Sequence, residues 1–226
     1  MTDAGKREAI VEAARELERT GLNQGSAGNI SLRDGAAMLI TPSGVAARDL
    51  RSEAVARVAL DDESGASAGP LPPSSEWRFH RDILRARPDA NAIVHTHSPY
   101  ATVLAVLRRD IPAAHYMIAA FGGACVRCTD YAPYGTAELS RLAVEGLAGR
   151  HAVLLGNHGA IVTGADLERA MWRAVELEAL ARTYYLASLL GQPVILPDDE
   201  IERMVKRFES YGVIGRAGKT GGEERS

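Results

Sequence analysis

The stretch ANAIVHTHSPYA, residues 90–101, decides how the rest of the chain is interpreted. A short apolar run precedes His95 and His97, which are separated by one residue. In an extended strand, side chains at positions i and i+2 point to the same face, so both imidazoles would lie side by side where a buried strand ends. Histidine is also a common partner of backbone carbonyls. The pair alone is therefore compatible with two metal ligands or with two polar residues that alternate on a strand.

A third histidine occupies a comparable position in AVLLGNHGAIVTG, residues 152–164. We predict two strand segments here, joined by a tight turn at residues 157–159, with glycine beside His158 leaving space for a close backbone approach. Three histidines at the ends of core strands can converge on a zinc ion and leave its fourth position open. Glu76, expected in the first turn of a helix, would supply an oxygen ligand or a base beside the metal.

Other residues that commonly bind metals lack such a setting. Cys125 and Cys128 form a C-x-x-C pair, but a structural zinc needs four ligands and the sequence has no second pair of this kind. We interpret them as unremarkable thiols near a strand. The remaining histidines are His80, His115 and His151, of which we expect the first and the last at surface or helix positions.

Glycines and small polar residues gather in GLNQGSAGNIS (21–31), TPSG (41–44) and PSSE (73–76). These residue types dominate turns. They also suit a phosphate cradle, in which hydroxyls, an amide and backbone N–H groups surround an anion and Ser74 and Ser75 lie at a helix N-terminus. No lysine follows as it does in nucleotide-binding loops. Spacing alone supports the turn and the cradle equally.

Hydrophobic periodicity predicts alternating helices and strands without a long linker. The dipeptide Asp34-Gly35 predicts an antiparallel hairpin of residues 29–33 with 36–41, and residues 61–70 should form a solvated loop. Helices are expected over residues 3–20 with Asp3 as N-cap, from Ser74 or Ser75 to before Pro88, and over 136–147, 166–190 and 198–210. One mixed α/β domain over residues 1–214 accounts for this pattern, followed by a disordered tail over 215–226.

The composition of the chain indicates which kinds of molecule it binds. A chain of 226 residues can bury a core without disulfides. Its net charge of −3 gives no sign of a basic face, so we expect a small-molecule ligand and no nucleic acid. The sequence has no apolar run of about 18 residues, and its N-terminus is too charged for a signal peptide. We therefore expect no membrane association and a cytoplasmic location.

Together these stretches resemble the class II aldolase/adducin family, most closely its L-fuculose-1-phosphate aldolases. The order and spacing of the matching blocks make the resemblance specific, and it covers nearly the whole chain except the tail. The blocks are GLNQGSAGNIS, MLITPSG, LPPSSEWRFH, RPDANAIVH, IPAAHYMIAAFGG and NHG, from residue 21 to residue 159, with a weaker likeness in FESYG at 208–212.

The resemblance implies a three-layer α/β/α sandwich with a largely antiparallel central sheet, assembled as a C4 homotetramer. It also implies a zinc ion (Zn²⁺) in each subunit, with Mn²⁺ or Co²⁺ chemically acceptable at the same site. The implied metal ligands are His95, His97, His158 and, in the resting site, Glu76. The implied phosphate site comprises Ser26, Gly28, Asn29, Ser43, Gly44, Ser74 and Ser75, with serine at positions 26 and 43 replacing threonines of close relatives.

The reaction implied by the resemblance is reversible cleavage of a ketose 1-phosphate, such as L-fuculose 1-phosphate, to dihydroxyacetone phosphate and an aldehyde such as L-lactaldehyde. Zinc would act as a Lewis acid at the substrate oxygens. Glu76, displaced from the metal, would exchange a proton at the C3 carbon. Tyr116 matches a tyrosine that acts from a neighbouring subunit, the alternative being interface packing. Phe208 and Tyr211 match a C-terminal segment that closes over the site, the alternative being packing at a helix end.

Related activities share this fold and these histidines. L-ribulose-5-phosphate 4-epimerases carry an aspartate in the block that corresponds to residues 113–123, where this chain has none. Decarboxylases of sugar-acid phosphates and methylthioribulose-1-phosphate dehydratases are further alternatives, and the aldehyde could differ, as in salvage of 5-deoxypentose phosphates. An adducin-like interaction domain would lack the metal histidines, which this chain retains. The resemblance thus favours an aldolase.

Overall fold

A nine-stranded, mostly antiparallel sheet forms the centre of the protein in a computed structural model that describes residues 1–210. Its strand order is β4-β3-β2-β1-β5-β9-β8-β7-β6, and among these strands β7 and β8 pair in parallel. The strands are β1 (Asn29–Asp34), β2 (Ala37–Ile40), β3 (Ala56–Ala59), β4 (Ser67–Ala68), β5 (Ala92–Thr96), β6 (Ile111–Pro112), β7 (Cys125–Cys128), β8 (Ala152–Leu155) and β9 (Gly159–Gly164). The predicted mixed α/β class and largely antiparallel sheet are thus confirmed.

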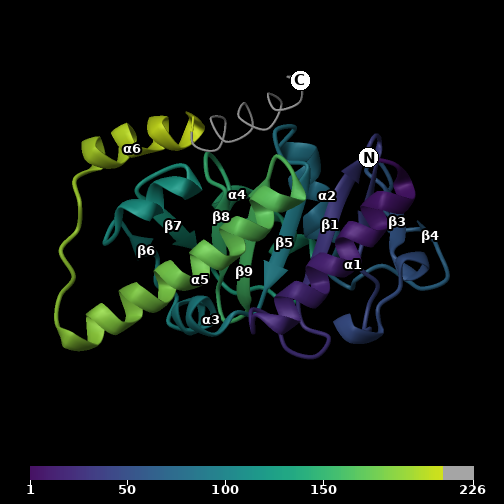
Figure 1. The fold of residues 1–226 in the computed structure, drawn as a ribbon, viewed down its shortest axis with the longest axis horizontal. Helices are drawn as coiled ribbons and strands as arrows, with labels where there is room; N and C mark the ends of the chain where they lie inside the picture. Colours follow the sequence, from purple (N-terminus) through teal and green to yellow (C-terminus); the bar gives the residue numbers. More distant parts are fainter. Residues whose placement is uncertain (211–226) are drawn as a thin grey trace, which may run out of the picture.

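Helices cover both faces of this sheet, because alternate strand residues contribute to two different apolar cores. Ala92 and Val94 of β5 belong to one core, and Ile93 belongs to the other. The first core lies under α1 (Asp3–Arg19), α3 (Pro99–Val106) and α5 (Leu167–Leu190), and Figure 1 shows α1 and α5 crossing this face. The second core lies under α2 (Trp77–Ala86) and α4 (Ala137–Gly146).

Shorter elements complete the described chain. These are the 3-10 helices η1 (Ala47–Asp49), η2 (Ser52–Ala54) and η3 (Tyr116–Phe121), and the helix α6 (Asp198–Ser210). The helix α6 packs against η3. Among the residues that the structure describes, no helix combines the length and the apolar character needed to cross a bilayer.

The expected hairpin is confirmed, with Asp34 paired to Ala37 across the turn. The helices expected over 136–147, 166–190 and 198–210 are confirmed as α4, α5 and α6. Other expected details of the secondary structure are wrong. The N-cap of α1 is Thr2, whose side chain accepts a hydrogen bond from the Gly5 N–H, and the loop over 61–70 contains the short strand β4.

The helix expected from Ser74 begins later, at Trp77, with Glu76 in the N-cap position. Ser74 is therefore not the N-cap, and its backbone N–H donates to Thr41 O at 2.9 Å beside the bridge between Pro42 and Pro73. The Glu76 side chain makes no capping hydrogen bond and is used elsewhere. The predicted tail over 215–226, the predicted domain end at residue 214 and Tyr211 lie outside the described residues.

Candidate functional site

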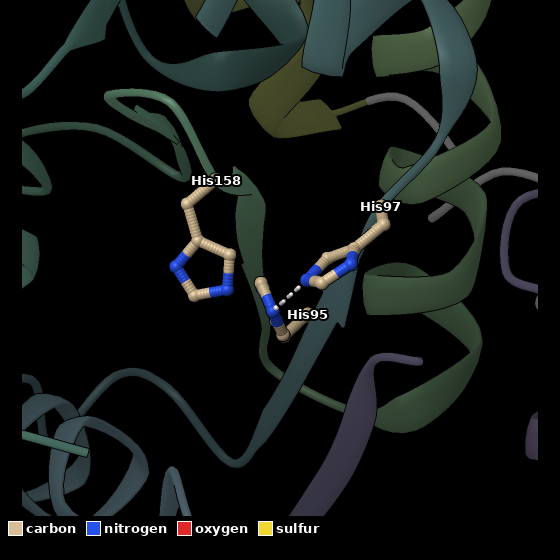
Figure 2. A group of neighbouring side chains, drawn as sticks. All are labelled: His95, His97 and His158. Atoms are coloured by element: carbon tan, nitrogen blue, oxygen red, sulfur yellow. Dashed lines mark hydrogen bonds between the residues drawn. The ribbon is translucent and has the colours of Figure 1, made fainter. Parts of the chain in front are cut away.

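Three histidine rings face one another where β5 ends and the turn between β8 and β9 begins (Figure 2). The Nε2 atoms of His95 and His97 are 3.0 Å apart, and the His158 ring centroid lies 4.9 Å from each of the other two. One ligand nitrogen from each ring lies within 4.8 Å of the others. The structure thus brings together the three histidines that the sequence singled out.

Hydrogen bonds fix which nitrogen of His95 faces this cluster. Its Nδ1 lies 2.9 Å from Ala160 O, and because a carbonyl only accepts, Nδ1 carries the proton and Nε2 keeps its lone pair. The backbone N–H of His97 donates to Asn23 Oδ1 at 2.9 Å, which anchors the segment after β5. Burial lowers the pKa of His97 and of His158 to about 4. Both rings therefore offer unprotonated nitrogens at neutral pH, as metal ligands must.

The close approach of the two histidine segments depends on Gly159. A Cβ atom at this position would lie 2.4 Å from Thr96 O and 2.8 Å from His97 Cδ2. Neither neighbour is the free end of a flexible side chain, so a larger residue must push the strands apart. Glycine beside His158 therefore sets the spacing of the cluster.

We expect Gly159→Ala to lower the free energy of unfolding by about 1–3 kcal/mol, the usual cost of overpacking a filled interior. It should also weaken metal binding, because the displaced strands carry the ligands. Urea unfolding and zinc titration would measure both effects. Gly191→Ala is the matched control, since a Cβ there meets nothing within 4 Å. Equal stability of the two variants would contradict this role of Gly159.

Glu76 lies beside the histidines, with 7 % of its surface exposed. Its Oε2 accepts a hydrogen bond from Asn29 Nδ2 at 2.9 Å and lies 3.2 Å from His95 Nε2. Its Oε1 is buried and lacks a hydrogen-bond partner, although His158 Nε2 is 3.2 Å away. Burial by itself would raise the pKa of Glu76, but its contacts with the imidazoles of His95 and His158 and the hydrogen bond from Asn29 lower it by more. The carboxyl group is therefore ionised.

These donors fit a divalent metal ion. Three imidazole nitrogens and one carboxylate are a donor set that zinc prefers. The buried Oε1 of Glu76 has no other partner to satisfy it, and a buried carboxylate oxygen without one is costly. His95, His97, His158 and Glu76 would hold the ion.

A cavity of about 360 Å³ opens beside the cluster. Glu76, His97 and His158 line it together with all the residues of the predicted phosphate site: Ser26, Gly28, Asn29, Ser43, Gly44, Ser74 and Ser75. Two strands position these groups, because Asn29 of β1 pairs with His95 of β5 and Pro42 bridges to Pro73. Their roles toward a substrate remain predictions, but their convergence on one cavity favours the cradle over unrelated turns.

The two glycines in this cavity serve different ends. Gly28 has φ +71°, and a Cβ there would lie 2.5 Å from His95 O, so glycine allows the loop to pack on the strand that carries the histidine. Gly44 also has φ +71°, but a Cβ there would meet nothing within 4 Å. The position is open and leaves the backbone accessible to a ligand.

Sequence reasoning missed several residues around the site. Tyr131 and Tyr134 line the same cavity from the segment after β7. Neither belongs to a periodic pattern, and the sequence carried no signal for them. Asn23, which anchors His97, lies inside the quoted block GLNQGSAGNIS and could have been found there.

His80 occupies a helix, one of the two settings that we expected for it, but it does not lie at the surface. It lies on α2, has 0 % exposure and contacts Asn29 Oδ1 and Ser31 Oγ through its two ring nitrogens. Burial lowers its pKa to about 3, so the ring is neutral. The sequence predicted this helix but not the burial of the His80 side chain, because its partners come from a distant strand.

The remaining candidates lie away from the cavity within this chain. Tyr116 is half exposed at the start of η3, with its ring against His115. Phe208 of α6 lies against Trp172 and lines a separate cavity. Cys125 and Cys128 are free thiols within β7, and burial raises the pKa of Cys128 to about 11. The structure therefore does not bring Tyr116 or Phe208 to the site of the same chain.

Comparisons with known proteins agree with this geometry. A family model described as Class II Aldolase and Adducin N-terminal domain matches residues 8–185. The chain is 50% identical over 206 residues to a 5-methylthioribulose-1-phosphate/5-deoxyribulose-1-phosphate aldolase of Rhodospirillum rubrum, covering 91% of this chain and 92% of that protein. It is 44% identical over 205 residues to an L-fuculose phosphate aldolase of Escherichia coli, covering 90% and 94%. A solved L-fuculose 1-phosphate aldolase superposes with a TM-score of 0.88 at 39% identity, covering 92% and 98%.

Proposed function

Because the chain belongs to the class II aldolase and adducin N-terminal domain family, we propose that it is a metal-dependent aldolase that reversibly cleaves a ketose 1-phosphate to dihydroxyacetone phosphate and an aldehyde. One observation carries this proposal. A buried, ionised carboxylate and two of the three clustered histidines, His97 and His158, line a cavity whose lining also includes hydroxyl, amide and glycine backbone groups. Such a cavity can bind a phosphoryl group and hold a proton-transfer base beside a metal ion.

The metal ion, which we propose to be zinc, supplies Lewis-acid polarisation of the substrate carbonyl when it is bound. Glu76 is then the group that moves a proton at the C3 carbon of dihydroxyacetone phosphate. Its carboxylate has one oxygen held by Asn29 and another without a hydrogen-bond partner, so the second oxygen is available to a proton. Burial keeps this carboxylate largely out of bulk water, beside the cavity in which the substrate would bind.

The hydroxyl groups of Ser26, Ser43, Ser74 and Ser75 are proposed to bind the phosphoryl group. Ser43 N–H donates to Pro72 O at 3.2 Å, which ties the two serine-bearing loops together across the cavity. Gly44 leaves its backbone open to the same ligand. Recognition at this end requires only the phosphate, so it suits every ketose 1-phosphate equally.

The candidate substrates differ at the end of the sugar that becomes the aldehyde. L-fuculose 1-phosphate and a 5-deoxyribulose or 5-methylthioribulose 1-phosphate each release dihydroxyacetone phosphate, and they differ in the aldehyde. Identity of 50% to the Rhodospirillum rubrum enzyme and of 44% to the Escherichia coli enzyme supports both classes, with the five-carbon sugars favoured. Epimerase, decarboxylase and dehydratase activities on the same scaffold are outcomes of the test below.

Further parts of the proposal concern assembly. The exposed position of Tyr116 suits a residue that acts at the site of a neighbouring subunit, in a C4 homotetramer. Phe208, together with Tyr211 outside the described residues, is proposed to belong to a C-terminal segment that closes over the site. The two cores on opposite faces of the sheet support a three-layer α/β/α arrangement.

An assay for dihydroxyacetone phosphate release tests the activity. We expect release from L-fuculose 1-phosphate or from 5-deoxyribulose or 5-methylthioribulose 1-phosphate, loss of release with a chelator, and recovery with zinc. L-ribulose 5-phosphate serves as the epimerase substrate. Chelator-insensitive release would contradict the metal. Absence of release from every ketose 1-phosphate by protein that binds zinc would move the function to another reaction of the family.

A further inference from the structure

A line of buried hydrogen bonds runs from the interior of α2 to both halves of the site. His80 lies between Ser31, whose Oγ is 2.7 Å from His80 Nδ1, and Asn29, whose Oδ1 contacts His80 Nε2. Asn29 Nδ2 in turn lies 2.9 Å from Glu76 Oε2 and 3.0 Å from Ser74 Oγ. One amide therefore contacts the carboxylate beside the histidines and a hydroxyl of the phosphate cradle.

The partners of Asn29 fix the direction of each bond. An ionised carboxylate only accepts hydrogen bonds, so the Asn29 group that faces Glu76 is the NH₂ group. The Asn29 carbonyl oxygen must then face His80, and His80 Nε2 must carry the proton that it accepts. A neutral imidazole has one donor and one acceptor, so His80 Nδ1 accepts from the Ser31 hydroxyl.

The opposite assignment of donors and acceptors would place two acceptors against each other at one of two contacts. If His80 carried its proton on Nδ1, its Nε2 lone pair would face the Asn29 carbonyl oxygen. Turning the amide over would relieve that contact but would set the carbonyl oxygen against the Glu76 carboxylate. Ser31 and His80 are both 0 % exposed, so water cannot relieve the first repulsion, and the second arrangement would also take from the Glu76 carboxylate its hydrogen bond from Asn29.

The orientation of the Asn29 amide also determines the hydrogen bonding of Ser74 in the phosphate cradle. Ser74 Oγ accepts from Asn29 Nδ2 at 3.0 Å and from the Glu76 backbone N–H at 3.3 Å. Both lone pairs of this hydroxyl are then in use, and its own hydrogen is left to donate. Ser74 lines the cavity, so that hydrogen is available to an anion there.

We propose that His80 is a positioning residue which, through the Asn29 amide, orients the Glu76 carboxylate and leaves the Ser74 hydroxyl as a donor for the substrate phosphate. This inference deepens the proposed aldolase function and rests on it for the identity of the substrate. The ring of His80 is held in place by stacking on Phe79, with centroids 4.7 Å apart and planes at 24°. A rigid ring transmits its orientation to the amide without needing to touch the substrate.

Two substitutions at His80 separate positioning from packing. In His80→Gln, the side-chain NH₂ group can occupy the place of Nε2 and still donate to Asn29. In His80→Asn, the amide reaches only the place of Nδ1, so it can contact Ser31 but leaves Asn29 Oδ1 without a donor. Both variants introduce a neutral amide into the same buried position, and thermal unfolding would verify that both are folded.

We expect His80→Asn to weaken binding of inorganic phosphate and of zinc by about tenfold each, and to raise the KM for the ketose 1-phosphate by about tenfold, as loss of a hydrogen bond that supports charged groups would do. His80→Gln should restore each value to within about threefold of the unsubstituted protein. Isothermal titration gives the two affinities without turnover. Unchanged affinities in His80→Asn, or equal losses in the two folded variants, would overturn the proposal.

The tautomer of His80 in the unsubstituted protein provides a second test of the proposal. Protein labelled with ¹⁵N-histidine should show His80 protonated on Nε2 and unprotonated on Nδ1 in a long-range ¹H–¹⁵N spectrum. A proton on Nδ1 would overturn the proposal even if the aldolase is fully active. Absence of aldol cleavage with the expected tautomer and phosphate affinities would instead overturn the proposed function and leave the role of His80 intact.

Discussion

His95→Ala will lose its tightly bound metal and, with it, aldol cleavage. The ring of His95 has 0 % exposure, its centroid lies 4.8 Å from that of His97 and 4.9 Å from that of His158, and it offers Nε2 because Nδ1 donates to Ala160 O. Loss of a residue that merely supports a ligand costs about 10–100-fold in metal affinity, so loss of the ligand itself should exceed that range. Metal analysis of the purified variant and its rate of dihydroxyacetone phosphate release would measure the effect.

The matched control for this variant is His151→Ala. His151 is half-buried, and burial lowers its pKa to about 4, as it does for His97 and His158, but it lies outside the cluster, next to Arg87 and Thr163. It should keep its metal and most of its activity. A His95→Ala protein with the metal content and the rate of this control would refute the metal assignment. Parallel unfolding curves would exclude a general loss of structure as the cause.

Glu76→Gln should keep the fold and lose most proton exchange at dihydroxyacetone phosphate. The glutamine carbonyl can keep the hydrogen bond from Asn29, and its NH₂ group can occupy the position of Oε1, which accepts no hydrogen bond now. The substitution therefore removes the base at little structural cost. A loss of about 10²–10⁴-fold is expected, the usual contribution of a positioned general acid or base.

Solvent deuterium incorporation at C3 of dihydroxyacetone phosphate measures this exchange directly, without an aldehyde. Zinc must be supplied in excess, because Glu76→Gln also removes a proposed metal ligand. Glu145→Gln is a suitable control, since Glu145 is an exposed residue of α4 that pairs with Arg141. Exchange by zinc-loaded Glu76→Gln at the rate of the control would show that another group is the base.

The sequence predicted the parts of the molecule that local patterns encode. The hairpin follows from Asp34-Gly35, and α4 and α5 follow from periodicity between a cap and a breaking residue. The strands β3, β4 and β6 and the helix α3 were not predicted, and β4 and β6, with two residues each, carry no such pattern. Local signals therefore predicted the longest helices and the hairpin but not every shorter element.

The residues of the site also fall into those that the sequence could predict and those that it could not. His95, His97 and His158 could be found because strand alternation and a glycine turn predict where their side chains lie. His80 could not, because its partners on β1 are about 50 residues away in sequence. Tyr116 and Phe208 lie outside the cavity of their own chain, so no pattern within one chain can test their roles.

The ligands of this cluster are scattered along the chain, and this has a consequence for the order of folding. Glu76, His95 and His158 become neighbours only after β1 has paired with β5 and β5 has paired with β9. Contacts between segments so distant in sequence form late and slowly. An ion therefore meets no complete set of ligands on the nascent chain and binds a sheet that is already assembled. In a cell, the choice of metal would then be made by the finished protein and by the ions available to it.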